Sequence, residues 1–139
     1  MVTMDHAPRE LISSGSPYEG MIGCSRAVRV GDRVVFSGTA PIWPDGSCDP
    51  DVTRQAERCL EIITTALAAT GSGPEDVIRT RIYLTSREDW DAVGAVHGRI
   101  FGSIRPANTT TIVAGLVDPR WKVEFEVEAI VGSGVTQPR

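Results

Sequence analysis

Alternating apolar and polar positions predict β-strands in both halves of the chain. Residues 26–30 and 33–38 are rich in β-branched side chains, and Gly31-Asp32 between them is typical of a two-residue hairpin turn. The same period-2 pattern predicts further strands over residues 77–84, 109–114 and 122–131.

Two other stretches repeat their apolar residues every three or four positions, which predicts amphipathic helices. The first begins at Asp49-Pro50, with the aspartate as N-cap and the proline in the first turn. It continues for about 18–20 residues and ends before Gly71. The second follows Ser86, which begins a sequence similar to a capping box, and ends at Gly102.

The resulting order, β-β-α-β-α-β-β, predicts an α+β fold with one mixed sheet and two helices packed on one face. Residues 1–139 are expected to form a single domain, with residues 1–21 as a lead-in tail and residues 132–139 as a C-terminal tail. Helices on one side leave the other face of the sheet uncovered, and a homo-oligomer is a natural way to cover it.

The faces of two elements are also predictable. Alternation along residues 77–84 places Ile78 with Thr80, Ile82 and Leu84 on one side of the strand. Trp90, on the apolar side of the second helix, is expected to anchor the core.

Three carboxylates, Glu124, Glu126 and Glu128, share one face of the last strand. Like charges at this spacing repel one another unless opposite charges face them, and Arg79 and Arg81 form a matching row on another strand. One interpretation is therefore a cross-strand ladder of ion pairs. The other gives one carboxylate a role in orienting water or transferring protons.

Composition and charge exclude several classes of protein. The 139 residues are 41% hydrophobic and 23% charged, and the net charge of −4 with scattered basic residues argues against nucleic-acid binding. No run of about 18 apolar residues indicates a membrane span, and no apolar segment near Met1 indicates a secretory signal. Cys24, Cys48 and Cys59 form no CxxC pair, so the sequence predicts neither a metal site nor a disulfide framework. A cytoplasmic location is expected.

Several segments, in order, resemble the RidA (YjgF) family. They are Cys24-Ser25-Arg26-Ala27-Val28-Arg29-Val30-Gly31-Asp32, Val35-Phe36-Ser37-Gly38-Thr39-Ala40-Pro41, residues 76–85, Arg105-Pro106-Ala107-Asn108-Thr109 and Val123-Glu124-Phe125-Glu126-Val127-Glu128-Ala129-Ile130. The resemblance spans residues 22–131 and implies a chorismate-mutase-like fold and a homotrimer with small-molecule pockets between subunits. It also implies hydrolysis of reactive enamines and imines, such as 2-aminoacrylate, to a 2-keto acid and ammonia, with no metal or organic cofactor.

The resemblance carries over to the candidate site only in part. Ser37-Gly38 and Glu126 match the family pattern, and Glu126 is the candidate catalytic group. Asn108 stands where the family has an arginine, Cys24 where it has a tyrosine, and Gly94 where it has an asparagine. Because an asparagine carries no charge to bind a substrate carboxylate, 2-aminoacrylate hydrolysis should be weak or absent.

Other interpretations of these residues remain open. Arg105 is a candidate substitute for the missing guanidinium, although its Cα lies about 10 Å from that of Asn108 in an extended chain. Cys24 is either a nucleophile or a thiol that lines a pocket, and Gly38 either admits a ligand or bends the strand. The chain is thus either a divergent deaminase or a non-catalytic trimer that binds a metabolite or a partner.

Overall fold

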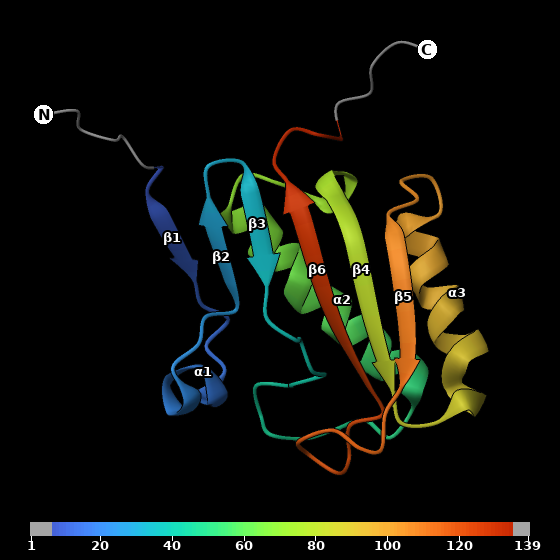
Figure 1. Ribbon diagram of the computed structural model, residues 1–139. Helices are drawn as coiled ribbons and strands as arrows, with labels where there is room; N and C mark the ends of the chain where they lie inside the picture. Colours follow the sequence, from blue (N-terminus) through green and yellow to red (C-terminus); the bar gives the residue numbers. More distant parts are fainter. Residues whose placement is uncertain (1–6, 135–139) are drawn as a thin grey trace, which may run out of the picture.

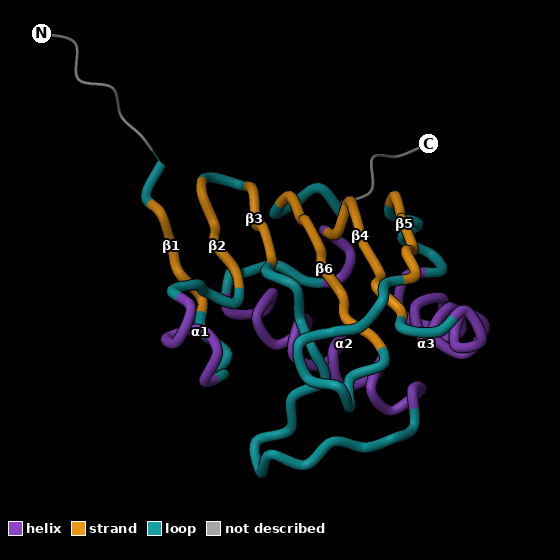
Figure 2. Tube along the Cα trace, turned by 60° about the horizontal axis from the view of Figure 1, so that its bottom comes forward, coloured by secondary structure: helices purple, strands orange, loops and turns teal. Residues whose placement is uncertain are grey.

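A six-stranded mixed sheet with two long helices on one face forms the body of the molecule in the computed structural model, which describes residues 7–134 (Figures 1 and 2). The strand order is β1-β2-β3-β6-β4-β5. The strands are β1 Arg9–Ile12, β2 Ala27–Val30, β3 Arg33–Phe36, β4 Val77–Leu84, β5 Ala107–Ile112 and β6 Val123–Ile130. The helices are α1 Pro17–Ile22, α2 Val52–Ala69 and α3 Trp90–Phe101, with short 3-10 helices η1 Pro74–Asp76 and η2 Arg87–Asp89.

The predicted α+β architecture is confirmed. The hairpin forms at Gly31-Asp32 with Val30 opposite Arg33, and Gly31 has a φ of +60° that favours glycine. β4 and β5 pair in parallel while the other neighbours are antiparallel, so the sheet is mixed. Helix α2 begins slightly later than predicted, because Asp51 rather than Asp49 caps it by accepting a hydrogen bond from the Thr53 amide.

The prediction of an unstructured N-terminal lead-in is wrong. Strand β1 pairs antiparallel with β2, and helix α1 begins after Ser16, whose side chain accepts a hydrogen bond from the Tyr18 amide. Ser16-Pro17 is an N-cap followed by proline, a helix-start signal that the sequence did contain. Residues 1–6 of the predicted lead-in and residues 135–139 of the predicted C-terminal tail lie outside the described residues.

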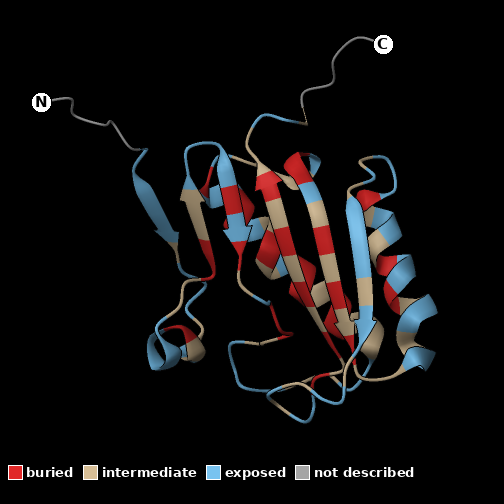
Figure 3. Cartoon of the chain, in the orientation of Figure 1, coloured by how far each residue is buried: buried red, intermediate tan, exposed pale blue. Residues whose placement is uncertain are grey.

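The core lies between the sheet and α2. Every second residue of β6 is buried, beginning with Val123 and Phe125 (Figure 3), and these residues belong to the same core cluster as the buried residues of α2. From α2 come Leu60, Ile63 and Leu67, each no more than 2% exposed. Truncating such a leucine to alanine costs about 2–5 kcal/mol.

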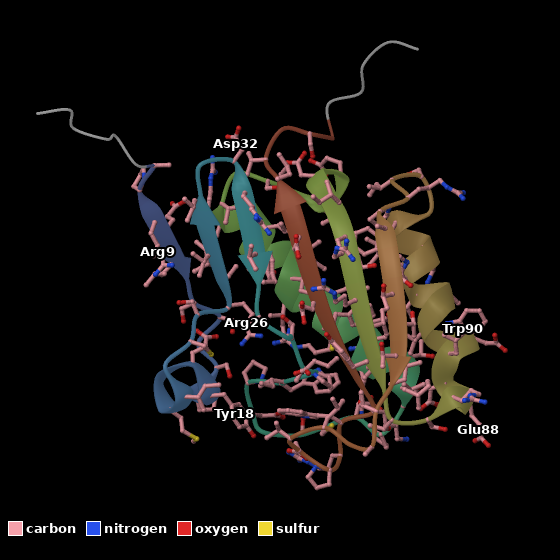
Figure 4. All side chains as sticks on the ribbon, in the orientation of Figure 1. Arg9, Tyr18, Arg26, Asp32, Glu88 and Trp90 are labelled. Carbon is pink, nitrogen blue, oxygen red and sulfur yellow. The ribbon has the colours of Figure 1, made fainter. Side chains whose placement is uncertain are left out.

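Two predictions about faces are wrong. A bulge between Val77 and Arg79 shifts the register of β4 against β6, so Val77 is buried and Ile78 is 44% exposed. Trp90 does not anchor the core: it is 58% exposed and points away from the body of the molecule (Figure 4). Val93, Val96 and Phe101 are the buried residues of α3.

Loops gather at one end of the sheet, below β3 and β6 (Figure 2). There the chain after β3 stays beside β6: the Thr39 amide donates to the Phe125 carbonyl at 2.6 Å, and the Phe125 amide donates back to Thr39 at 3.0 Å. This bridge places Ser37 and Gly38 alongside the first residues of β6. Over residues 7–134, no helix is both long and apolar enough to cross a membrane.

Candidate functional site

A hollow of about 320 Å³ opens at this end of the sheet. Its walls include Tyr18 from α1, Arg26 before β2, Gly38 after β3, Trp121 before β6 and Glu124 from β6 itself. Figure 4 places Tyr18 and Arg26 between α1 and the lower ends of the strands. The hollow therefore collects residues from four separate parts of the chain.

Glu124 lies close against the backbone of Gly38. A Cβ added to Gly38 would lie 3.1 Å from the Glu124 carboxyl carbon and 3.2 Å from its Oε2 atom, so the absence of a side chain there admits the carboxylate. Burial raises the pKa of Glu124, the positive charge of Arg26 opposes that rise, and the charge of Glu126 adds to it. Glu124 is thus a partly desolvated carboxyl group in a cavity wall, which is a common environment for proton transfer.

Arg26 is 5% exposed and is fixed by backbone and side-chain acceptors. Its Nη1 atom donates to the Gly38 carbonyl at 2.8 Å and to Thr39 Oγ1 at 3.1 Å. Its Nε atom lies 3.6 Å from Glu19 Oε2, beyond hydrogen-bond distance, and is a buried donor without a hydrogen-bond partner in residues 7–134. Arg26 therefore ties α1 to the strand end that carries Gly38.

Glu19 compensates part of this buried positive charge. Burial alone would raise its pKa, but hydrogen bonds from Ser13 and Ser14 and the charge of Arg26 outweigh burial and lower it. Glu19 and Arg26 consequently form a buried ion pair behind the hollow.

Ser37 and Cys24 occupy less reactive positions. The Ser37 hydroxyl donates to the Ser25 carbonyl at 2.6 Å, which holds the β2–β3 strand ends together. Cys24 is a half-buried free thiol in the wall of the hollow, in agreement with the pocket-lining interpretation. Of the predicted site residues, Cys24, Ser37 and Gly38 are thus brought together.

A second hollow, of about 370 Å³, adjoins the first and shares Arg26, Tyr18 and Trp121 with it. The Tyr18 and Trp121 rings meet edge to face with centroids 5.7 Å apart, and Trp43 is a further wall. The second hollow also has charged walls, which include Arg58, Asp118 and Arg120.

Glu126 does not border either hollow. Its Oε2 atom lies 2.7 Å from Arg81 Nη1, and its Oε1 atom accepts a 3.0 Å hydrogen bond from the Tyr83 hydroxyl. Arg81 also lies 3.8 Å from Glu128, which Arg33 approaches to 3.4 Å. The ladder of ion pairs is thus confirmed for Glu126 and Glu128, with Arg81 and Arg33 as the cations, whereas neither Glu124 nor Arg79 takes part in an ion pair among the described residues.

Asn108 is at the far edge of the sheet. Strands β6 and β4 separate β5 from β3, so three strand spacings, about 14 Å, lie between Asn108 and the Gly38 side. Its Nδ2 atom donates to Thr80 Oγ1 at 2.9 Å, and its Oδ1 atom accepts from Thr110 at 3.0 Å. Thr80 Oγ1 is also 2.8 Å from His97 Nε2, and burial lowers the pKa of this histidine. Within one chain, Asn108 therefore belongs to a polar network outside the hollow.

Gly94 and Arg105 also lie away from Glu124. Gly94 is exposed on α3, with open space where a Cβ would be. Arg105 has a φ of 59° in the turn after α3 and borders a separate hollow of about 250 Å³ beside His97. Within one chain, neither Gly94 nor Arg105 lines the hollow that contains Gly38.

Sequence reasoning missed Arg26, Glu124 and Tyr18 as site residues. Glu124 and Glu126 are equivalent in a period-2 pattern, and only the long-range bridge between Thr39 and Phe125 brings one of them to Gly38. For Arg26 a signal existed, because an arginine at the start of a half-buried strand needs partners. Tyr18 was hidden in the segment predicted as a lead-in.

Known proteins resemble this chain over most of its length. The family model described as Endoribonuclease L-PSP matches residues 19–131. An uncharacterized protein of Streptomyces coelicolor, SCO2049, is 42% identical over 125 residues, covering 88% of this chain and 92% of that protein. The 2-iminobutanoate/2-iminopropanoate deaminase of Salmonella typhimurium is 30% identical, covering 76% and 83%.

A solved structure of a family member also resembles this chain. Rv2704 of Mycobacterium tuberculosis, described as a member of the YjgF/YER057c/UK114 family, matches with a TM-score of 0.82 and 40% identity. The match covers 89% of this chain and 100% of that one. The chain therefore belongs to the YjgF/RidA family, whose matching family model is described as Endoribonuclease L-PSP.

Proposed function

We propose that this protein hydrolyses 2-imino acids to 2-keto acids and ammonia in the hollow between Gly38 and Glu124. The observation that carries the proposal is the half-buried Glu124 carboxyl group, packed against a glycine backbone and next to the Arg26 guanidinium. A carboxyl group with a raised pKa beside a cation suits a reaction that needs both proton transfer and charge stabilisation. The named deaminase of Salmonella typhimurium supports this reaction class.

The chemistry requires one water molecule. Glu124 takes a proton from water as the oxygen attacks the imine carbon, and the C=N bond becomes a single bond. The nitrogen takes up the proton that Glu124 carries, which gives a carbinolamine. Glu124 then removes the hydroxyl proton and passes it to the nitrogen, so that the C–N bond breaks as the C=O bond forms, and ammonia and the 2-keto acid leave. The raised pKa of Glu124 makes it a stronger base when ionised than an exposed glutamate.

The side chain of the substrate has room in the second hollow. Trp43, Tyr18 and Trp121 give that hollow aromatic walls, and it shares Tyr18, Trp121 and Arg26 with the hollow that contains Glu124. An imino acid with a branched or aromatic side chain would bury apolar surface there, whereas 2-aminoacrylate has no side chain to place. This favours larger imino acids over 2-aminoacrylate.

A homotrimer with sites between subunits is part of the proposal. The face of the sheet opposite α2 and α3 carries the partly exposed Val30 and Val35, and Val35 pairs with Glu128 of the ion-paired row on β6. A sheet face with apolar and charged residues is a suitable surface for a second copy. Light scattering should give a mass of three 15.0 kDa chains, and a monomer mass at micromolar concentration would contradict this part.

The test is keto-acid formation from freshly generated imines. An amino-acid oxidase supplies the imine of leucine or phenylalanine, semicarbazide traps what is not hydrolysed, and the Salmonella typhimurium deaminase is the reference. We expect this protein to accelerate hydrolysis of these imines and to act weakly on 2-aminoacrylate. Turnover of 2-aminoacrylate equal to that of the reference would contradict the proposed selectivity.

The alternative is a non-catalytic trimer that binds a metabolite. The observation that favours it is Asn108, whose side chain is occupied by Thr80 and Thr110 and carries no charge. A keto acid that binds to the hollow without any acceleration of imine hydrolysis would support this alternative.

A further inference from the structure

We propose that Arg26 binds the carboxylate of the substrate and thereby determines which compounds the hollow accepts. This inference rests on the proposed function and names the group that holds the substrate in the same cavity. A 2-imino acid carries a carboxylate beside its reacting carbon, and a guanidinium, a planar fork of N–H donors, binds a carboxylate through charge-assisted hydrogen bonds. Of the described residues that line the Glu124 hollow, Arg26 alone carries a positive charge.

The guanidinium of Arg26 has donors to spare. Nη1 is used by the Gly38 carbonyl and by Thr39 Oγ1, whereas Nη2 makes no hydrogen bond to any residue between 7 and 134. Nε lies 3.6 Å from Glu19, behind the hollow, and is therefore no donor for a ligand in the hollow. Nη2 is the donor of Arg26 that remains for an acceptor there.

The position of Arg26 also suits the reaction. Its bond to the Gly38 carbonyl fixes the guanidinium at the residue against which the Glu124 carboxyl group lies. A substrate carboxylate that accepts a hydrogen bond from Nη2 of Arg26 would therefore hold the adjoining imine carbon near Glu124. Glu19, at 3.6 Å from Nε, orients the guanidinium from behind. The structural contacts of Arg26 to Gly38 and Thr39 use Nη1 and leave Nη2 for a ligand.

Binding of a stable product analogue separates this role from turnover. The probes are 2-oxobutanoate and its uncharged amide, 2-oxobutanamide, titrated into the full-length protein by NMR or calorimetry. Because a hydrogen-bonded charge contact is worth about 10- to 100-fold in affinity, Arg26→Gln should weaken 2-oxobutanoate binding by that factor and leave the amide nearly unaffected. Arg29→Gln is the matched control, since Arg29 donates to the Gly31 and Thr70 carbonyls and does not border the hollow. It should change neither affinity.

Several outcomes would overturn the inference. If Arg26→Gln lowers the affinity for 2-oxobutanoate and for 2-oxobutanamide by the same factor, the residue only shapes the cavity. Loss of 2-oxobutanoate binding in Arg105→Gln, with binding intact in Arg26→Gln, would assign the carboxylate to Arg105. If Arg26→Gln does not fold, Arg26→Lys keeps the charge without the fork, and it should bind the acid more weakly than wild type while still preferring it to the amide.

The result is independent of whether the protein is an enzyme. Binding of 2-oxobutanoate that depends on Arg26 without imine hydrolysis would support this inference and contradict the proposed function. Hydrolysis with an unchanged KM in Arg26→Gln would support the function and contradict the inference.

Discussion

Glu126 is held by Arg81: the Oε2 and Nη1 atoms of these two residues lie 2.7 Å apart on neighbouring strands. The hydroxyl of Tyr83 donates a hydrogen bond to the other carboxylate oxygen of Glu126. Glu124, two residues earlier, has no such partner among the described residues and lies in the wall of a cavity. Two carboxylates on one face of β6 are therefore in different environments, one in an ion-pair network and one in the candidate site.

This difference predicts which glutamate is needed for catalysis. Glu124→Gln should lower kcat for imine hydrolysis by about 10²–10⁴-fold, the usual contribution of a general base, with thermal unfolding unimpaired. Glu126→Gln should retain most of the activity, because that carboxylate is occupied by Arg81 and Tyr83. Glu128→Gln controls for loss of a charge on the same strand. Loss of activity only in Glu126→Gln would reverse the assignment.

The titration of Glu124 is a second prediction. Burial raises its pKa above 4.5 and Arg26 opposes that rise, so ¹³C NMR of the labelled carboxyl group should show a midpoint above 4.5 that moves higher in Arg26→Gln. Glu126 and Glu19 are the other charges near this pair. Since folding raises this pKa, the stabilising contribution of protonated Glu124 is present below the unfolded pKa and is lost as pH rises through the folded one. A midpoint at or below 4.5 would contradict the cavity environment.

Gly38→Ala tests the close approach of backbone and carboxylate. The new methyl group would lie 3.1 Å from the carboxyl carbon of Glu124, so the side chain must move by a few tenths of an ångström. We expect kcat for hydrolysis to fall by about 10²-fold, the cost of a small misplacement of a catalytic group. Activity equal to wild type would show that Glu124 need not be positioned by this glycine.

Gly94→Ala should be stabilising. Gly94 lies in the exposed part of α3 and a Cβ there would meet open space, so alanine should raise the free energy of unfolding by about 0.5–1 kcal/mol. Chemical denaturation measures this directly. A destabilised variant would mean that another copy of the chain packs against this position.

Asp76 predicts a dependence of stability on pH at the opposite end of the sheet. Burial would raise its pKa, but hydrogen bonds from the Gly132 and Gly134 amides and from Ser72 outweigh burial and lower it from 3.8. Its contribution to stability is therefore present above that value and is lost as pH falls through the folded pKa. Asp76→Asn should cost about 1–3 kcal/mol at pH 7, whereas the exposed Glu75→Gln should cost little. Equal stability of both variants would contradict this account.

Local patterns were sufficient for the elements of the fold. The hairpin at Gly31-Asp32 and helix α2 follow from turn chemistry and from apolar residues at helical spacing, which are properties of neighbouring residues. Strand β1 was missed because four residues without clear alternation become a strand only through pairing with β2. Trp90 was misplaced because the sequence does not fix how far the helix layer reaches around the start of α3.

The site was less predictable because it depends on long-range contacts. Gly38 was identified, but its neighbour is set by the bridge between Thr39 and Phe125, which lie 86 positions apart in the sequence (125 − 39). That bridge selects Glu124 instead of Glu126. Arg26 likewise becomes part of a site only when α1, absent from the predicted fold, places Glu19 behind it.

The most direct test of the central claim is the rate of keto-acid release from the imine of leucine, measured with wild-type protein and Glu124→Gln side by side. Wild-type protein should hydrolyse the imine well above the buffer rate and the variant at a rate close to that of buffer, with both proteins folded. Equal rates for the two proteins, or no acceleration by wild type, would contradict the assignment of imine hydrolysis to the Gly38–Glu124 hollow.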